Sequence, residues 1–278
     1  MNIGNRRKPK ALDYLRLFLG ILETIIFIFP VLWMIMTGFK TGNQAFSNST
    51  SFFFKPSFDN YREVLFKSDF KSALITSLKA VSISVVFTII LASGIAYPMA
   101  RIPSQGMNRL ASWIISLRIV PPIVTIIPLF LLLRNIKLTG SIWSLVLVYT
   151  FMNMPLAVWL LRGFFKEVPR EIEEAAELDG LDSKRIFLKI VLPLSAPGVV
   201  ATALLSFVFA WNDFLFANIL SGATTRTATV GLTEFVTPVG TAWTTIMAAG
   251  TIVVIPVWIA ALFAQKYLVR GLTMGSVK

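Results

Sequence analysis

Six long apolar segments constrain the fold of this chain more than any other feature of its sequence. Each is about as long as the roughly 20 helical residues that cross the hydrocarbon core of a bilayer. Charged or turn residues bound them, and none shows the alternation that a membrane β-barrel strand requires. The sequence therefore predicts an all-α membrane protein with a single domain, residues 1–278. Its transmembrane helices are expected at 15–39, 73–97, 111–133, 141–161, 196–220 and 242–267.

The composition supports a membrane environment and excludes several kinds of site. Hydrophobic residues make up 55% of the 278 residues and charged residues only 14%, which is unusual for a water-soluble domain. There is no cysteine and no histidine, so thiolate nucleophiles, imidazole bases and His- or Cys-ligated metal sites are excluded. We expect no catalytic residue, no metal site and no cofactor bound to this chain.

The basic residues predict which side of the membrane each loop faces. With the amino terminus inside, the inner segments hold sixteen lysines and arginines and the outer segments hold eight, in the direction of the positive-inside rule. This distribution explains the net charge of +12 without nucleic-acid binding. The first segment is too long for a signal peptide and has no small-residue cleavage pattern, so we expect a retained anchor. Both termini are then cytoplasmic.

The only long inner loop, 162–195, carries five of the fourteen acidic residues within eleven positions. Pro169 suits the first turn of a helix, acidic residues there complement the helix dipole, and Gly180 suits a left-handed stop after Asp179. Asp182 or Ser183 can cap a second helix with apolar residues at helical spacing. The loop is therefore expected to form a helix, a glycine turn and a second helix that Pro193 interrupts.

This loop resembles the EAA loop of ATP-binding-cassette (ABC) importer permeases and fits its spacing at every defined position. The residues that carry the match are Glu174, Ala175, Ala176, Gly180, Ile190, Leu192 and Pro193. The segments 56–65 (PSFDNYREVL), 209–215 (FAWNDFL) and 265–278 (QKYLVRGLTMGSVK) are similar to the smaller permease of maltose-type carbohydrate importers. The sequence departs from that branch at Trp211-Asn212-Asp213, where such permeases often have Trp-Asn-Glu.

The resemblance implies a membrane subunit of a sugar, oligosaccharide or polyol importer in a bacterial or archaeal plasma membrane. In such importers the EAA helix seats in a groove on a dimeric ABC ATPase, which binds ATP and magnesium. This chain has no phosphate-binding loop of its own. The resemblance also implies two further partners, a second homologous permease and an extracytoplasmic solute-binding protein.

Ionisable and polar residues within membrane segments are functional candidates, because they are rare there and face the bundle interior. Glu23 and Arg118 are expected at similar depth and could form an intramembrane ion pair. Asn153, Trp211, Asn212 and Asp213 could line a carbohydrate pathway, since amides and carboxylates bind hydroxyl groups and aromatic faces cover sugar rings. Hydrogen bonds to neighbouring helices are an equally good explanation for the polar groups.

Two other classes of function compete with the importer subunit. A self-contained secondary transporter or channel would couple transport to an ion without an ATPase, and the EAA spacing argues against it. An intramembrane enzyme would need a serine–lysine or paired-carboxylate site. The carboxylates of Glu23 and Asp213 are expected near opposite faces of the membrane, which argues against such a pair.

Overall fold

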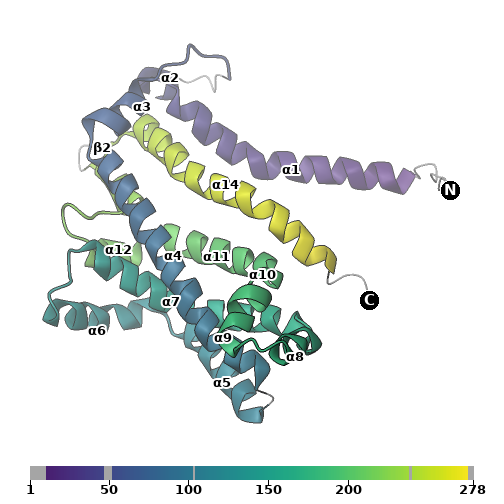
Figure 1. Cartoon of the computed structure of the whole chain (residues 1–278). Helices are drawn as coiled ribbons and strands as arrows, with labels where there is room; N and C mark the ends of the chain where they lie inside the picture. The colour runs from purple at the N-terminus through teal and green to yellow at the C-terminus, as the bar shows by residue number, and fades with distance from the viewer. Residues whose placement is uncertain (1–10, 47–51, 103, 238–239, 275–278) are drawn as a thin grey trace. The chain divides into compact units, whose positions relative to one another are not determined.

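The computed structural model describes residues 11–46, 52–102, 104–237 and 240–274, which are predominantly helical (Figure 1). The chain divides into two compact units. One unit comprises Met1–Lys67 and Phe235–Ile252, and the other comprises Ser68–Glu234 and Val253–Lys278.

The first unit combines the amino-terminal helix with short elements from both ends of the chain. Its elements are α1 (Ala11–Gly38), α2 (Gly42–Phe46), α3 (Asp59–Arg62), the π-helical turn η1 (Glu63–Lys67), the strands β1 (Val236–Thr237) and β2 (Gly240–Thr241), and the beginning of α14 (Trp243–Met274). The two strands pair antiparallel, with Val236 opposite Thr241.

The segment after α1 folds back onto the end of that helix around a buried lysine. Lys40 is 4% exposed, and its ammonium lies 4.6 Å from the Trp33 ring centroid and 5.2 Å from that of Phe54. The Asn60 amide donates to the carbonyl oxygens of Gly38 and Lys40, at 2.8 Å each. Cation–π contacts and two hydrogen bonds thus fix the turn that follows α1.

The second unit contains most of the helices. They are α4 (Phe70–Arg101), α5 (Gln105–Ser116), the 3-10 turn η2 (Leu117–Ile119), α6 (Pro122–Asn135), α7 (Ile142–Glu167), α8 (Arg170–Leu178), α9 (Ser183–Ile186), the π-helical turn η3 (Phe187–Val191), α10 (Leu192–Leu194), α11 (Ala196–Trp211), α12 (Leu215–Leu220), α13 (Ala228–Gly231), the 3-10 turn η4 (Leu232–Phe235), and the remainder of α14.

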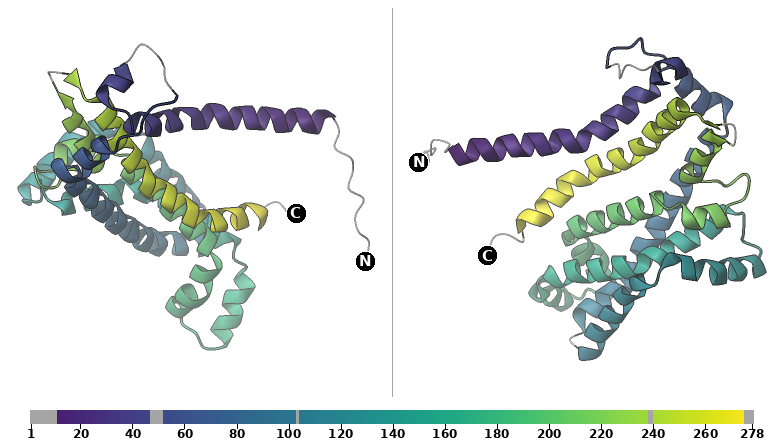
Figure 2. Two further views of the ribbon diagram at one scale, coloured as in Figure 1. Left: turned by 90° about the horizontal axis from the view of Figure 1, so that it is seen from above. Right: turned by 180° about the vertical axis from the view of Figure 1, so that it is seen from behind.

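Helices α4 and α7 pack together at the centre of the second unit, and α11 lies against both (Figure 2). Small residues recur at three- or four-residue spacing on the buried face of α4: Ala73, Ser77, Ala80, Ser84, Thr88, Ala92 and Ala96. Such residues let helix backbones approach closely where lipid removes the hydrophobic driving force. A similar close approach joins α11 to α7, since Gly198 abuts the Phe164 ring.

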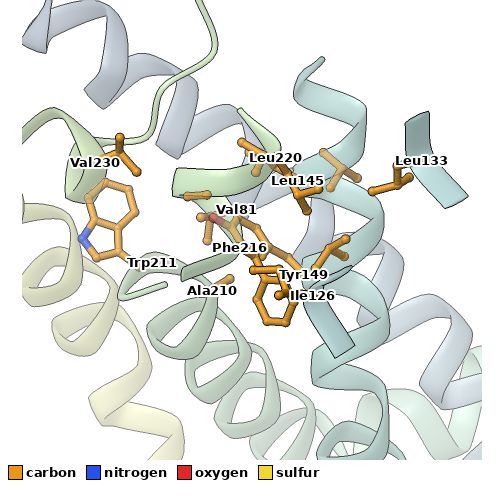
Figure 3. Packing of buried hydrophobic residues seen from close by; sticks show 14 residues of the cluster. Val81, Ile126, Leu133, Leu145, Tyr149, Ala210, Trp211, Phe216, Leu220 and Val230 are labelled. Carbon is orange, nitrogen blue, oxygen red and sulfur yellow. The ribbon is translucent and has the colours of Figure 1, made fainter. Parts of the chain in front are cut away.

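A hydrophobic cluster fills the space among α4, α6, α7, α11 and α12 (Figure 3). Tyr149 of α7, Phe216 of α12 and Ile126 of α6 lie together in it, and Trp211 lies at one end. The cluster holds the break between α11 and α12 against α7, and this break contributes to the cavity described below.

Four of the predicted spans are confirmed as single helices long and apolar enough to cross a membrane, namely α1, α4, α7 and α14. The span expected at 111–133 is a broken one, because α5 with η2 meets α6 at 93°. Two adjacent prolines, Pro121 and Pro122, supply no backbone donors and force the break.

The predicted span 196–220 is also not one helix. α11 ends at Trp211 and α12 begins at Leu215, while the helix ending at Leu194 meets α11 at 78°. If each bent pair is one span, the described residues contain up to six spans.

Candidate functional site

The loop 162–195 folds as the predicted helix, turn and helix. α8 begins after Pro169 and ends in a left-handed turn at Gly180, whose φ is +85°. The amide of Gly180 donates to the carbonyl of Glu177 at 3.0 Å, and that of Leu181 to the carbonyl of Ala176 at 3.1 Å. These two hydrogen bonds form a Schellman motif, which favours glycine at this position.

The second helix of the loop runs through α9, η3 and α10 and contains a π-helical turn just before Pro193. A proline within a helix cannot donate to the preceding turn and its ring displaces a carbonyl there, which the wider turn accommodates. Ile190 is half-buried against the hydrophobic cluster beneath the loop, Leu192 is half-buried and Pro193 is exposed.

Helix α8 has an inward face and an outward face. Glu173 and Ala176 point inward and are only 7% and 6% exposed. Glu174 and Ala175 are exposed, and Leu178 is 91% exposed. Only one of the two adjacent alanines of the EAA pattern therefore faces outward, because Ala176 packs into the cluster beneath α8.

The inward carboxylate holds α8 to the end of α4. Glu173 forms an ion pair with Arg101, and the Tyr97 hydroxyl donates to its other oxygen at 2.7 Å. Arg101 also donates to the backbone carbonyl of Val168, at 3.3 Å. The sequence pattern points to Glu174 and does not predict this anchor. The available signal was a tyrosine and an arginine four residues apart at the end of a predicted span, which places them on one helix face.

Aromatic packing supports the same anchor. The Tyr97 ring lies 4.8 Å from the Phe187 ring and 6.2 Å from the Phe165 ring, measured between centroids. These three rings come from α4, η3 and α7, so both halves of the loop are tied to the membrane helices. Displacement of α8 would act directly on α4 and α7.

A cavity of about 410 Å³ lies among η2, α6, α7 and the α11–α12 break. Three of the polar residues selected from the sequence line it, namely Asn153, Asp213 and Arg118. Thr125 adds a hydroxyl, and Phe209 adds an aromatic side chain. The cavity thus combines hydrogen-bonding groups with aromatic surface, as sites for polar organic solutes do.

Asp213 is placed by the break between two helices. Its carboxylate accepts from the amides of Phe216 at 3.4 Å and Ala217 at 3.0 Å, at the start of α12. Tyr149 lines the same cavity as Asp213. The Asn153 amide donates to the carbonyls of Tyr149 at 3.0 Å and Ser206 at 3.3 Å, so its nitrogen serves helix packing.

The other two pathway candidates lie outside the lining of this cavity. Trp211 is 2% exposed, stacks on Phe207 with ring centroids 5.5 Å apart, and donates from its indole nitrogen to the Val253 carbonyl at 3.1 Å. Asn212 is exposed and donates to the Val208 carbonyl of its own helix at 2.8 Å.

The suggested pair of Glu23 and Arg118 stays a prediction, because the two residues belong to different compact units. Within its own unit, Arg118 stacks over the Phe209 ring, 4.5 Å from its centroid. This cation–π contact lies at the cavity and partly satisfies the guanidinium.

Comparisons with known proteins identify what this arrangement resembles. Residues 84–274 match the model of the family described as "Binding-protein-dependent transport system inner membrane component". The trehalose transport system permease protein SugB of Mycobacterium tuberculosis is 35% identical over 273 residues, covering 93% of this chain and 96% of that protein. The trehalose/maltose transport system permease protein MalG of Thermococcus litoralis is 34% identical over 278 residues, covering 98% and 99% respectively.

A solved structure shares the fold. A chain of a bacterial ABC transporter involved in the import of the acidic polysaccharide alginate aligns with a TM-score of 0.77 and 20% identity. The alignment covers 96% of this chain and 100% of that one.

Proposed function

This chain belongs to the family of binding-protein-dependent transport system inner membrane components, and we propose that the solute it helps to import is a carbohydrate. The chain is a multi-pass membrane permease subunit of an ABC importer and not an enzyme, and ATP is hydrolysed by a separate subunit. The proposal concerns the solute, the contacts with that ATPase and the remaining partners.

The cavity that Asn153 and Asp213 line is the observation that carries the carbohydrate assignment. Its carboxylate, hydroxyl and amide groups suit sugar hydroxyls, and the aromatic side chains beside them suit the apolar faces of a sugar ring. The names of full-length relatives, which include trehalose and maltose systems, support the same solute class. We assign Asp213 and Asn153 to the pathway, with Trp211 and Asn212 supporting the helix break.

The outward face of α8 supports contact with the ATPase. Glu174, Ala175 and Leu178 present a carboxylate, a small side chain and a large apolar side chain in succession on an exposed face. The exposed Leu178 would supply an apolar contact next to the Glu174 carboxylate on this face. This face fits the helix-in-groove mode of recognition, with Glu174 opposite a basic residue of the ATPase.

The remaining residues of the EAA pattern position this face. Gly180 sets the turn after α8, while Ile190, Leu192 and Pro193 shape the helix on which α8 rests. ATP-driven movement of the ATPase subunits would reach the membrane helices through this loop. We further propose a second homologous permease, an extracytoplasmic binding protein and cytoplasmic termini.

Native mass spectrometry of the tagged protein, purified with its partners, tests the assembly. We expect two ATPase copies and one different permease. The variant Glu174→Arg should lose the ATPase and retain membrane insertion, because it reverses a contact charge without changing a span. The matched variant Glu234→Arg reverses an exposed charge outside the loop and should keep the ATPase.

Uptake of labelled trehalose and maltose into proteoliposomes of the whole complex tests the solute. Transport that needs ATP and a carbohydrate supports the proposal. Transport by this chain alone, driven by an ion gradient, would instead establish the secondary-transporter alternative.

A further inference from the structure

A second cavity, of about 670 Å³, lies where α4 and α7 end and α5 and α8 begin. We call it the basic cavity because its charged lining is four cations and one anion: Arg101, Arg162, Lys166, Arg170 and Glu171. It shares no lining residue with the cavity of Asn153 and Asp213.

Two of the three arginines of the basic cavity, Arg162 and Arg170, are held in place by neutral groups, whereas Arg101 is paired with Glu173. Arg162 donates to the Met99 carbonyl at 3.2 Å and to the Asn108 side chain, and Arg170 donates to the Arg101 carbonyl at 2.6 Å. These contacts orient the guanidinium groups without cancelling their charge, and each retains further donors.

Lys166 and the starts of two helices contribute to the positive potential. Within the described part of the chain, no hydrogen bond or ion pair engages the exposed Lys166 ammonium. The amino-terminal ends of α5 and α8 also lie in the cavity wall, at Ser104 and Pro169, and both carry partial positive charge from the helix dipole. The chemistry of this cavity therefore favours an anion such as a phosphate group.

An apolar groove adjoins the basic cavity along α7. This α7 groove, of about 300 Å³, shares Arg162 and Lys166 with the cavity and continues over Trp159, Leu160, Gly163 and Phe164, with the Glu167 carboxylate also in its lining. Trp159 is 49% exposed. A cationic end joined to an apolar groove matches a ligand with an anionic head and a hydrocarbon tail.

The predicted spans place this combination at the level of the lipid headgroups. The apolar segments end at Tyr97 and Leu161, and Arg101 and Arg162 follow within one helical turn. Basic side chains at this depth contact phospholipid phosphates. A free phosphate would use the cations and leave the α7 groove empty.

We propose that the basic cavity binds the phosphate of an anionic phospholipid and that one acyl chain lies in the α7 groove. This assignment is independent of the transported solute. Arg101 also pairs with Glu173, and its carbonyl accepts from Arg170, the first residue of α8. The bound lipid would therefore hold the loop that we assign to ATPase contact.

Native mass spectrometry of the complex in nanodiscs of phosphatidylglycerol and phosphatidylcholine tests the lipid site. Wild type should retain phosphatidylglycerol preferentially after release from the nanodisc. The double variant Lys166→Gln/Arg170→Gln should bind it about 30-fold more weakly, since each basic residue near anionic lipid contributes about a factor of five. The control Lys184→Gln/Lys189→Gln removes the same charge from exposed positions of the second loop helix and should retain wild-type binding.

Three further measurements decide between lipid and other ligands. Excess inorganic phosphate should leave the retained lipid in place, and Trp159→Ala should weaken retention without removing a charge. If the double variant misfolds, the single variant Lys166→Gln replaces it, because this change removes no hydrogen bond or ion pair within the described residues. It should show part of the loss of phosphatidylglycerol binding. The proposal would be overturned if both double variants retained phosphatidylglycerol equally, or if wild type showed no preference for it over phosphatidylcholine. It would also be overturned if phosphate displaced the lipid, or if Lys166 crosslinked to the ATPase in place of lipid.

Discussion

Replacing Glu173 by glutamine should release helix α8 from the membrane helices, while the same replacement at the neighbouring Glu174 should not. The two residues are adjacent in the sequence and differ in where they point. The Glu173 side chain is 9% exposed and its partner Arg101 is 15% exposed, whereas Glu174 is exposed. The comparison therefore isolates the effect of burial on one type of substitution.

The magnitude follows from the charge that is left behind. Glutamine preserves the shape of the side chain and still accepts from the Tyr97 hydroxyl, so the main loss is the charge that compensates Arg101. Breaking a buried ion pair from one side destabilises by about 3–5 kcal/mol. The residual exposure of both partners favours the lower value, about 3 kcal/mol, which corresponds to about a 150-fold change in the local opening equilibrium.

Hydrogen exchange of the α8 amides, measured by mass spectrometry on the purified complex, reports this opening. Glu173→Gln should increase exchange in the peptide covering 170–180 by about two orders of magnitude. Glu174→Gln should change it little, since exposed substitutions usually stay within about 0.5 kcal/mol. Adding Arg101→Met to Glu173→Gln should recover much of the protection, because no buried charge then lacks a partner. Equal exchange in the two single variants, or no recovery in the double variant, would refute the anchoring role.

Substitutions at Gly180, Gly198 and Asp213 test the geometry. Gly180→Ala should destabilise the loop by about 1–2 kcal/mol in the same exchange experiment, because alanine is strained at a φ of +85°; an unchanged 170–180 peptide would contradict the turn. Gly198→Ala would place a methyl 2.0 Å from the Phe164 ring, so we expect a lower melting temperature and partial rescue by Phe164→Leu. An unchanged melting temperature in Gly198→Ala would contradict the close approach of α7 and α11. Asp213→Asn should keep one capping hydrogen bond and fold normally, whereas Asp213→Ala should cost about 1 kcal/mol; sugar uptake that is normal in both variants would remove Asp213 from the pathway.

The sequence predicts the single-helix spans well because a long apolar run determines a helix in lipid almost by itself. The broken spans are harder to predict. Pro121 and Pro122 mark the break after α5, but the 93° turn depends on how α6 packs on its neighbours. The break after Trp211 has no such marker. It is stabilised by Asp213, whose capping role becomes visible only when α12 is formed.

The loop 162–195 shows the same division between local and tertiary information. Its helix and glycine turn follow from Pro169, Gly180 and the acidic residues between them. The choice between Glu173 and Glu174 as the buried carboxylate depends on Arg101, which lies more than 70 residues earlier in the chain. Spacing within one short helix cannot supply that contact.

The small residues on α4 also determine how that helix can move. Alanine loses no rotamer freedom when it is buried, so this side of the contact with α7 forms at little entropic cost. The large side chain of Tyr97, which contacts Phe165 of α7, follows the last residue of this row of small side chains. Shear between packed helices consists of small displacements along a contact. Along this row the α4–α7 contact can therefore remain tightly packed and still adjust its register by small displacements.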